Sequence, residues 1–327
     1  MDPPPSLPAN QLFSLAGQNV LITGATRGWS LSLGIQPPFF FSSVHESRFH
    51  FVPDALLVHY HPLLRIGAAC AIALAEAGAS ICLVQRPGST NLQTFKTISE
   101  LGVTVNIVEC DISDHDAVRT LFERALNVMG GEIHVLVNCA GIQRRSPATE
   151  FSEKDWDDVL DVNLKSCWLL SQAAGRHMVP LRRGKIINFC SLLTFQGGFT
   201  VPAYAAAKGA LGQLTKALSN EWSKDNVQVN GIVPGYIATD ISSSGSVPSV
   251  PRTIFLTDVS IARNEKLLAD PVRLRQISER IPAGRWGQPQ DFAGPIVFLA
   301  SKASQYVCGE LLVVDGIEEL VLTEATL

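Results

Sequence analysis

Tyr204 and Lys208 stand four positions apart in the segment YAAAK. Residues at this spacing lie on the same face of a helix, so the pattern predicts a phenol and an ammonium side by side. The ammonium stabilises the phenolate, which suits the phenol to exchanging a proton with an oxygen atom. Ser191 follows the apolar segment KIINFC and offers a hydroxyl that can hydrogen-bond the same oxygen. A Tyr-x-x-x-Lys pair alone is also common on plain surface helices, so the interpretation depends on the other motifs.

A glycine-rich turn is the second motif with a chemical role. The apolar segment NVLITGA reaches Gly24, Gly28 follows, and Gly67 opens an alanine-rich helical segment. A strand, glycines and a helix in this order predict a dinucleotide-binding turn. The glycines let the backbone approach a pyrophosphate, and the helix N-terminus offers free N–H groups to it. The motif is interrupted, because residues 29–65 separate Gly28 from the helix.

The elements that must position these residues follow a regular alternation. Short apolar segments alternate with longer helical segments along most of the chain. This predicts an α/β fold, a single Rossmann-type domain over residues 1–327 with a doubly wound parallel sheet and helices on both faces. Ligands of such sheets bind at the carboxyl ends of the strands. Residues 29–65 and 241–263 break the alternation, and we expect both to be irregular insertions, the second in the region of a substrate lid.

Composition narrows the class of protein. The 327 residues are 46% hydrophobic and 17% charged with a net charge of −4, as in globular proteins. The charge gives no reason to expect nucleic acid or a membrane surface as a partner. The seven cysteines form no C-x-x-C pair, which favours free thiols, and the histidines of residues 29–65 match no metal motif. We expect a cytoplasmic protein, because no signal peptide or membrane span is recognisable.

The segment NCAG at 138–141, together with Asn163, Ser191 and YAAAK in this order, resembles the short-chain dehydrogenase/reductase family. The resemblance extends over about residues 17–316 apart from the two insertions. It implies an NAD(P)-dependent oxidoreductase with Ser191, Tyr204, Lys208 and Asn163 as catalytic residues, Asn163 holding a water that links Lys208 to solvent. The residues expected at the cofactor are Gly24, Arg27, Gly28, Gly67, Arg86, Asp111, Asn138, Ala140, Gly141, Tyr204, Lys208, Pro234, Gly235, Ile237 and Thr239.

The choice between NAD(H) and NADP(H) depends on the end of the second predicted strand. NAD-binding turns usually carry an acid there to bind the ribose hydroxyls, and this chain has Gln85 and Arg86 instead. Arg86 and Arg27 suit a 2′-phosphate, so the residues favour NADP(H), with NAD(H) left open. Asp111 is expected to accept a hydrogen bond from the adenine amino group. Alternatively it starts the next helix, a role that Ser113 or Asp114 could also fill.

Within the family, three segments look most like the group of 2-deoxy-D-gluconate 3-dehydrogenase and 2-dehydro-3-deoxy-D-gluconate 5-dehydrogenase: SLLTFQGGFTVPAYAAAKGAL, NEWSKDNVQVNGIVPGYIATD and RIPAGRWGQPQDFAGPIVFLAS. The resemblance implies a deoxy sugar acid as substrate. Arg144 and Arg145 are candidates for its carboxylate, because a guanidinium fork suits a carboxylate, and Gln196 for a hydroxyl. A solvated arginine pair in a loop is an equal alternative. A 3-oxoacyl carrier-protein reductase is the second candidate activity.

The chain also departs from the family. The family pattern runs directly from RG to IG and from ATD to NEKLLADP, and residues 317–327 form an atypical tail. We hypothesise that both insertions and the tail are translated introns or gene-model errors, with real insertions as the alternative. Sequencing of the mature transcript would test this. An insertion after Gly28 could misplace the phosphate donors, so a catalytically impaired dinucleotide-fold protein is the alternative to an active enzyme. The resemblance further implies a homotetramer or homodimer formed through the helix that carries Tyr204.

Overall fold

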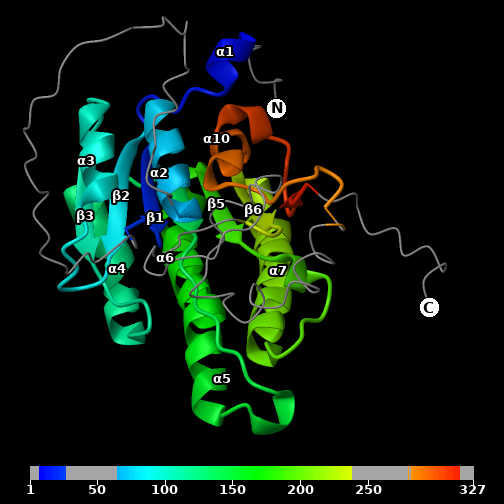
Figure 1. Ribbon diagram of the computed structural model, residues 1–327. Coiled ribbons are helices and arrows are strands. Elements are labelled where there is room, and N and C mark those ends of the chain that lie inside the picture. Colours follow the sequence, from blue (N-terminus) through cyan, green and yellow to red (C-terminus); the bar gives the residue numbers. More distant parts are fainter. Residues whose placement is uncertain (1–6, 27–64, 238–278, 280, 317–327) are drawn as a thin grey trace, which may run out of the picture.

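The computed structural model describes residues 7–26, 65–237, 279 and 281–316, and its core is a parallel sheet of seven strands (Figure 1). The strand order is β3-β2-β1-β4-β5-β6-β7, and every pairing is parallel. The strands are β1 (Asn19–Thr23), β2 (Ser80–Gln85), β3 (Val105–Glu109), β4 (Val135–Asn138), β5 (Gly184–Phe189), β6 (Val227–Pro234) and β7 (Leu311–Val314). The predicted doubly wound α/β fold is therefore confirmed.

Helices cover both faces of the sheet (Figure 1). The α-helices are α1 (Ala9–Leu12), α2 (Ile66–Glu76), α3 (Gln93–Glu100), α4 (His115–Val128), α5 (Glu153–Leu160), α6 (Ser166–Leu181), α7 (Pro202–Trp222) and α10 (Ala293–Ala300). A π-helical turn, η2 (Asp161–Lys165), joins α5 to α6. The short 3₁₀ turns are η1 (Ala148–Glu150), η3 (Leu192–Thr194), η4 (Ser223–Asp225), η5 (Pro289–Phe292) and η6 (Lys302–Ser304).

The alternation of side chains along the strands divides the core into two layers. Val20 and Ile22 of β1 pack with α2 and α10 on one face. Leu21, between them, packs with α4 and α6 on the other. All three side chains are buried, because a central parallel strand has helices on both sides. This is why the strands are apolar throughout rather than at alternate positions.

The order of the strands fixes where a ligand can bind. The chain runs from β1 to β2 and β3 on one side and then crosses to β4 on the other side of β1, so a crevice opens at the carboxyl ends of β1 and β4. Gly24 follows β1 and Cys139 follows β4, so both lie at this crevice. The fold thus brings the glycine turn and the NCAG segment together.

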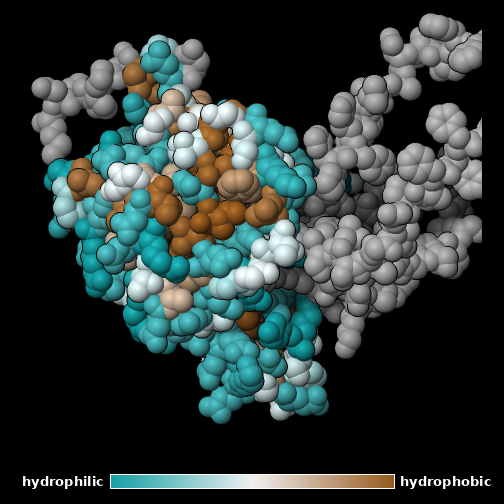
Figure 2. Space-filling model, turned by 90° about the vertical axis from the view of Figure 1, so that its left-hand side faces the viewer, coloured by the Kyte–Doolittle hydropathy of each residue, from teal (hydrophilic) through white to brown (hydrophobic). Residues whose placement is uncertain are grey.

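The surface of the described residues carries some apolar area. Figure 2 views the molecule from the side where α3 and β3 lie, and apolar side chains form a band across the middle of that face. Leu92 and Leu101, beside the two ends of α3, are both exposed.

In the described part of the chain, no helix combines the length and apolarity needed to cross a membrane. The predicted insertions 29–65 (Arg65 excepted) and 241–263 and the tail 317–327 lie outside the described residues.

Candidate active site

A cavity of about 400 Å³ opens at the carboxyl edge of the sheet. Its lining comes from the segments that follow six of the strands, so residues distant in sequence meet there. The predicted site residues that line it are Gly24, Gly67, Arg86, Asp111, Ala140, Gly141, Ser191, Tyr204, Lys208, Pro234, Gly235 and Ile237. A volume of this size is typical of a small-molecule or cofactor pocket.

The glycine turn forms part of the cavity lining. Gly24 has φ +77°, and a Cβ there would lie 2.8 Å from Ala140 Cα. A Cβ on Gly67 would lie 2.6 Å from the carbonyl oxygen of Gly24, so α2 approaches the turn more closely than any side chain permits. Thr23 Oγ1 accepts hydrogen bonds from Cys139 N and Ala140 N, both at 3.1 Å, and thereby ties the two strand ends together. This close backbone approach fits a dinucleotide, whose pyrophosphate needs backbone rather than side chains beside it.

Tyr204 and Lys208 project from the first turns of α7. Lys208 Nζ lies 5.6 Å from the centroid of the Tyr204 ring and donates a hydrogen bond to the carbonyl oxygen of Phe189, at the end of β5. Its side chain is buried, whereas that of Tyr204 is half-buried and lines the cavity. The carbonyl of Phe189 thus holds the ammonium next to the phenol.

Ser191 follows β5 and lines the same cavity. Its Oγ accepts a hydrogen bond from Leu193 N at 3.2 Å, because Ser191 caps the short turn η3. Thr194 Oγ1 donates to the carbonyl oxygen of Lys208 at 3.0 Å. The turn after β5 is therefore connected to α7 at Lys208.

Asn163 lies in the π-helical turn between α5 and α6, where it is fully buried. Asn163 Nδ2 donates to the carbonyl oxygen of Ile142 at 2.7 Å, and Ile142 N donates to Asn163 Oδ1 at 3.0 Å. A Cβ on Gly141 would lie 2.6 Å from Asn163 Oδ1 and 4.0 Å from Lys208 Nζ. The side chain of Asn163 thus fixes the segment after β4 directly beside Lys208.

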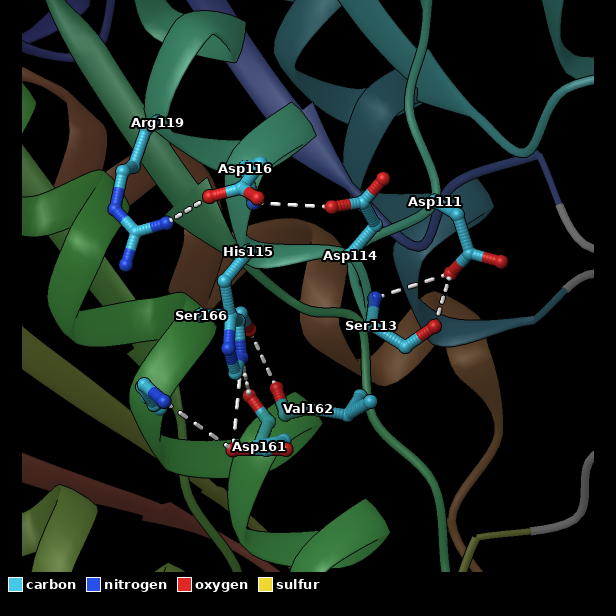
Figure 3. Close-up of polar contacts among 10 residues, drawn as sticks. Asp111, Ser113, Asp114, His115, Asp116, Arg119, Asp161, Val162 and Ser166 are labelled. Atoms are coloured by element: carbon cyan, nitrogen blue, oxygen red, sulfur yellow. Dashed lines mark hydrogen bonds and ion pairs between the residues drawn. The ribbon is translucent and has the colours of Figure 1, made fainter.

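The other end of the cavity contains an ion pair. Arg86 Nε lies 3.3 Å from Asp111 Oδ2, and both residues line the cavity. Asp111 Oδ1 accepts from Ser113 N at 3.0 Å and from Ser113 Oγ at 2.7 Å (Figure 3). Asp114 is the residue that caps α4, accepting from Asp116 N and Ala117 N. The alternative role of Asp111 as a helix cap is therefore taken by Asp114.

Several predicted residues lie away from the cavity lining. Asn138 is buried in the sheet, where its amide donates to Ser171 Oγ at 3.2 Å and Asn188 Oδ1 at 2.9 Å. Arg144 is paired with Asp155 at 3.2 Å, and Arg145 Nη1 lies 3.3 Å from the carbonyl oxygen of Phe199. The backbone N–H of Gln196 donates to the carbonyl oxygen of Leu192. Arg27, Gly28 and Thr239 lie outside the described residues.

The structure adds lining residues that the sequence analysis missed. Arg65 occupies the N-cap position of α2 and lines the cavity next to Ile66 and Gly67. The sequence analysis counted Arg65 in the insertion and therefore did not name it as a site residue. Tyr236 and Trp286 also line the cavity, with their ring centroids 5.4 Å apart. No spacing signal connects these two aromatic residues, because a long stretch of chain separates them.

The thiols of Cys139 and Cys190 also line the cavity, and both have raised pKa values. Burial raises the pKa of Cys139 to about 12 and that of Cys190 to about 11, although the charge of Lys208 opposes the shift. Both thiols are therefore neutral at physiological pH. Because the thiolate is the nucleophilic form of cysteine, neither thiol is activated for nucleophilic attack.

Family models match most of the chain. One described as short chain dehydrogenase matches residues 65–246, and one described as enoyl-(acyl carrier protein) reductase matches residues 257–316. The 2-dehydro-3-deoxy-D-gluconate 5-dehydrogenase of Escherichia coli is 42% identical over 252 residues, covering 77% of this chain and 90% of the relative. The chain belongs to the short-chain dehydrogenase family. It is an NAD(P)-dependent oxidoreductase, as the resemblance implied.

Two further relatives of this short-chain dehydrogenase align over nearly its whole length. The gluconate 5-dehydrogenase of Gluconobacter oxydans is 33% identical and covers 93% of this chain and 96% of its own. The crystal structure of a gluconate 5-dehydrogenase from Burkholderia cenocepacia, in complex with NADP and tartrate, is 32% identical with a TM-score of 0.72. That comparison covers 94% of this chain and 97% of the other.

Proposed function

We propose that this short-chain dehydrogenase transfers a hydride between NADP(H) and a hydroxyl or ketone group of a deoxy sugar acid. The observation that carries the proposal is that Ser191, Tyr204 and Lys208 line the same cavity as the glycine turn. A proton-transfer group and a dinucleotide cradle in one cavity are what reduction of a ketone requires. The named relatives act on gluconate and on 2-dehydro-3-deoxy-D-gluconate, which supports a sugar acid as the substrate class.

The roles of the polar groups follow from their positions. When bound, the nicotinamide accepts or supplies the hydride. In the reductive direction, Tyr204 Oη gives a proton to the alkoxide that forms, and in the oxidative direction it takes one. Ser191 Oγ holds the same oxygen by a hydrogen bond. Lys208 stabilises the phenolate, and Asn163 keeps the Gly141–Ile142 segment in place beside the ammonium.

Arg86 supports the choice of NADP(H). It lines the cavity beyond the end of β2, where a dinucleotide fold places the adenine ribose. Its guanidinium suits the 2′-phosphate by charge and by its planar, two-donor edge. Arg27, Gly28 and Thr239 are proposed to contribute to the same cofactor from outside the described residues, and Asn138 to support the turn from within the sheet.

For the substrate, Arg144, Arg145 and Gln196 remain the proposed carboxylate and hydroxyl partners. Arg144 Nε lies 3.2 Å from Asp155 Oδ1 of α5, so a substrate carboxylate would have to share this guanidinium with Asp155 or replace it. The loop and the segment that follows Gln196 are joined, because Ser146 N donates to the carbonyl oxygen of Thr200 at 3.1 Å. A substrate held by both segments would therefore lie next to Ser191.

A substrate panel tests the activity. The purified full chain is incubated with NADP⁺ and gluconate, 2-deoxy-D-gluconate or 2-dehydro-3-deoxy-D-gluconate, and with NADPH and a 3-oxoacyl thioester, and absorbance at 340 nm is followed. We expect turnover of a sugar acid, and a Tyr204→Phe variant slower by about 100-fold or more. Turnover of the thioester alone, or equal rates for Tyr204→Phe and the wild type, would overturn the proposal.

We further propose that the chain is one domain and assembles as a homodimer or homotetramer through α7 and its neighbours. α5 and α6 pack against α7, and Trp156 and Trp168 on these helices are exposed. Large aromatic side chains on a surface are typical of contact between chains. Light scattering behind size-exclusion chromatography should give the mass of two or four chains, and a Trp168→Glu variant should reduce it. A monomeric wild type would contradict the proposal.

A further inference from the structure

Asp111, expected from the sequence to contact the adenine amino group, forms an ion pair with Arg86 in the structure. Its Oδ2 lies 3.3 Å from Arg86 Nε, at the point where β2 and β3 end side by side. Cys110 N donates to the carbonyl oxygen of Gln85 at 2.7 Å, so the residues just before this pair are joined through the backbone. The carboxylate and the guanidinium are thus brought together by the sheet itself.

The carboxylate is held in a fixed orientation. Ser113 N and Ser113 Oγ both donate to Asp111 Oδ1, in a local turn that Figure 3 shows. One oxygen of Asp111 therefore points along its own turn and the other toward Arg86. The negative charge is compensated on both sides, which reduces its repulsion of a nearby phosphate.

The contact leaves part of the guanidinium available. Arg86 contacts Asp111 through Nε, so the edge formed by Nη1 and Nη2 remains for a second anion. The side chain is 55% exposed, and without a partner it would sample many rotamers. A carboxylate that fixes Nε therefore orients the edge that a phosphate needs.

We propose that Asp111 is a positioning residue for cofactor selectivity: it orients Arg86 toward the 2′-phosphate of NADP(H). The inference rests on the proposed function, in which Arg86 binds that phosphate. Asp111 then strengthens binding of NADPH and leaves binding of NADH unchanged. A contact to the adenine amino group would instead strengthen both equally, and simple charge repulsion would weaken binding of NADPH.

A set of variants of the full chain tests this by fluorescence titration with NADPH and with NADH. Arg86→Gln should weaken NADPH binding by about 10-fold or more. Asp111→Asn should weaken it by about three- to fivefold, the size expected of an exposed ion pair, with NADH affinity unchanged. In the Arg86→Gln background, Asp111→Asn should have no effect on NADPH, since there is no guanidinium left to orient.

Asp116→Asn is the matched control, because Asp116 forms an ion pair with Arg119 on the surface of α4 (Figure 3). It should change neither affinity. Equal loss of NADPH and NADH affinity in Asp111→Asn, tighter NADPH binding, or an unchanged NADPH affinity would each overturn the inference. Failure of the wild type to bind either dinucleotide would overturn the proposed function, and with it this inference.

Discussion

The amide of Asn163 and the backbone of Ile142 are joined by two hydrogen bonds, one in each direction, at 2.7 and 3.0 Å. This double contact links the π-helical turn to the segment after β4, and so to the surroundings of Lys208. π-Helical turns frequently occur at functional sites, where they redirect a side chain that a regular helix would point elsewhere. Here the turn directs Asn163 toward the Gly141–Ile142 segment beside Lys208.

Replacing Asn163 by alanine removes both hydrogen bonds and leaves the backbone N–H and C=O of Ile142 without these partners. We expect turnover to fall by about 10-fold or more and the free energy of unfolding by about 1–3 kcal/mol. Asn163→Asp should be at least as damaging, because a carboxylate oxygen then faces the carbonyl of Ile142. Steady-state kinetics and thermal unfolding measure these effects, with Asn127→Ala on the exposed face of α4 as control. Full activity in Asn163→Ala would contradict the assigned role.

Gly67→Ala tests the contact between α2 and the glycine turn. The added methyl would lie 2.6 Å from the carbonyl oxygen of Gly24, so helix or turn must move. We expect at least about a 10-fold loss of affinity for NADPH, since the backbone donors of the turn are displaced. Gly294→Ala in α10 is the matched control, because a Cβ there meets nothing within 4 Å. Equal NADPH affinity in both variants would show that the close approach is unimportant for binding.

Arg65 gives a prediction that differs from the one for Arg86. Arg65 lies at the N-terminus of α2 and lines the cavity, where a dinucleotide fold places the pyrophosphate. We expect Arg65 to contact the pyrophosphate, which both dinucleotides share. Arg65→Gln should weaken NADPH and NADH binding alike, by about 5- to 10-fold. Arg176→Gln on α6 is the control, and a loss confined to NADPH would place Arg65 at the 2′-phosphate instead.

Lys185 makes the stability of the protein depend on pH. The side chain is buried in β5, Nζ donates to Ser304 Oγ at 3.0 Å, and burial lowers the pKa of the ammonium from 10.5 to about 8. Between these pH values the unfolded chain binds more protons than the folded one, so the contribution of Lys185 to the free energy of unfolding increases with pH. The increase from pH 8 to 10.5 is of the order of 3 kcal/mol.

Urea unfolding of the wild type and of Lys185→Met at several pH values measures this increase. Buried thiols with raised pKa values, such as Cys82, act in the opposite direction above pH 9, so the difference between the two proteins is the quantity to compare. The difference should change in favour of the wild type as the pH rises. A difference that is independent of pH would contradict the account.

The sequence was sufficient for the fold because strands and helices alternate clearly and each strand is apolar. It was also sufficient to bring Ser191, Tyr204 and Lys208 together, because parallel strands present their carboxyl ends at one edge. The π-helical turn could not be predicted, since the segment around Asn163 has the same apolar spacing as a regular helix. The pairing of Arg86 with Asp111 depends on the register of β2 and β3, which no local pattern specifies.

Arg65 illustrates a different limit. It was assigned to the predicted insertion, and only the structure places it at the start of α2 and in the cavity lining. The buried amide network of Asn138 was equally hidden, because NCAG identifies a motif without showing which side chains face inward. In both cases, burial in three dimensions decides the role of the side chain.

The most direct test of the central claim is a fluorescence titration of NADPH and NADH with the full 327-residue chain. The account predicts saturable binding of one NADPH per chain, with NADPH bound more tightly than NADH. Such a result would establish that the glycine turn, α2 and Arg86 form one cofactor site despite the long segment between Gly28 and α2. No saturable binding, or NADH bound at least about 10-fold more tightly than NADPH, would contradict it.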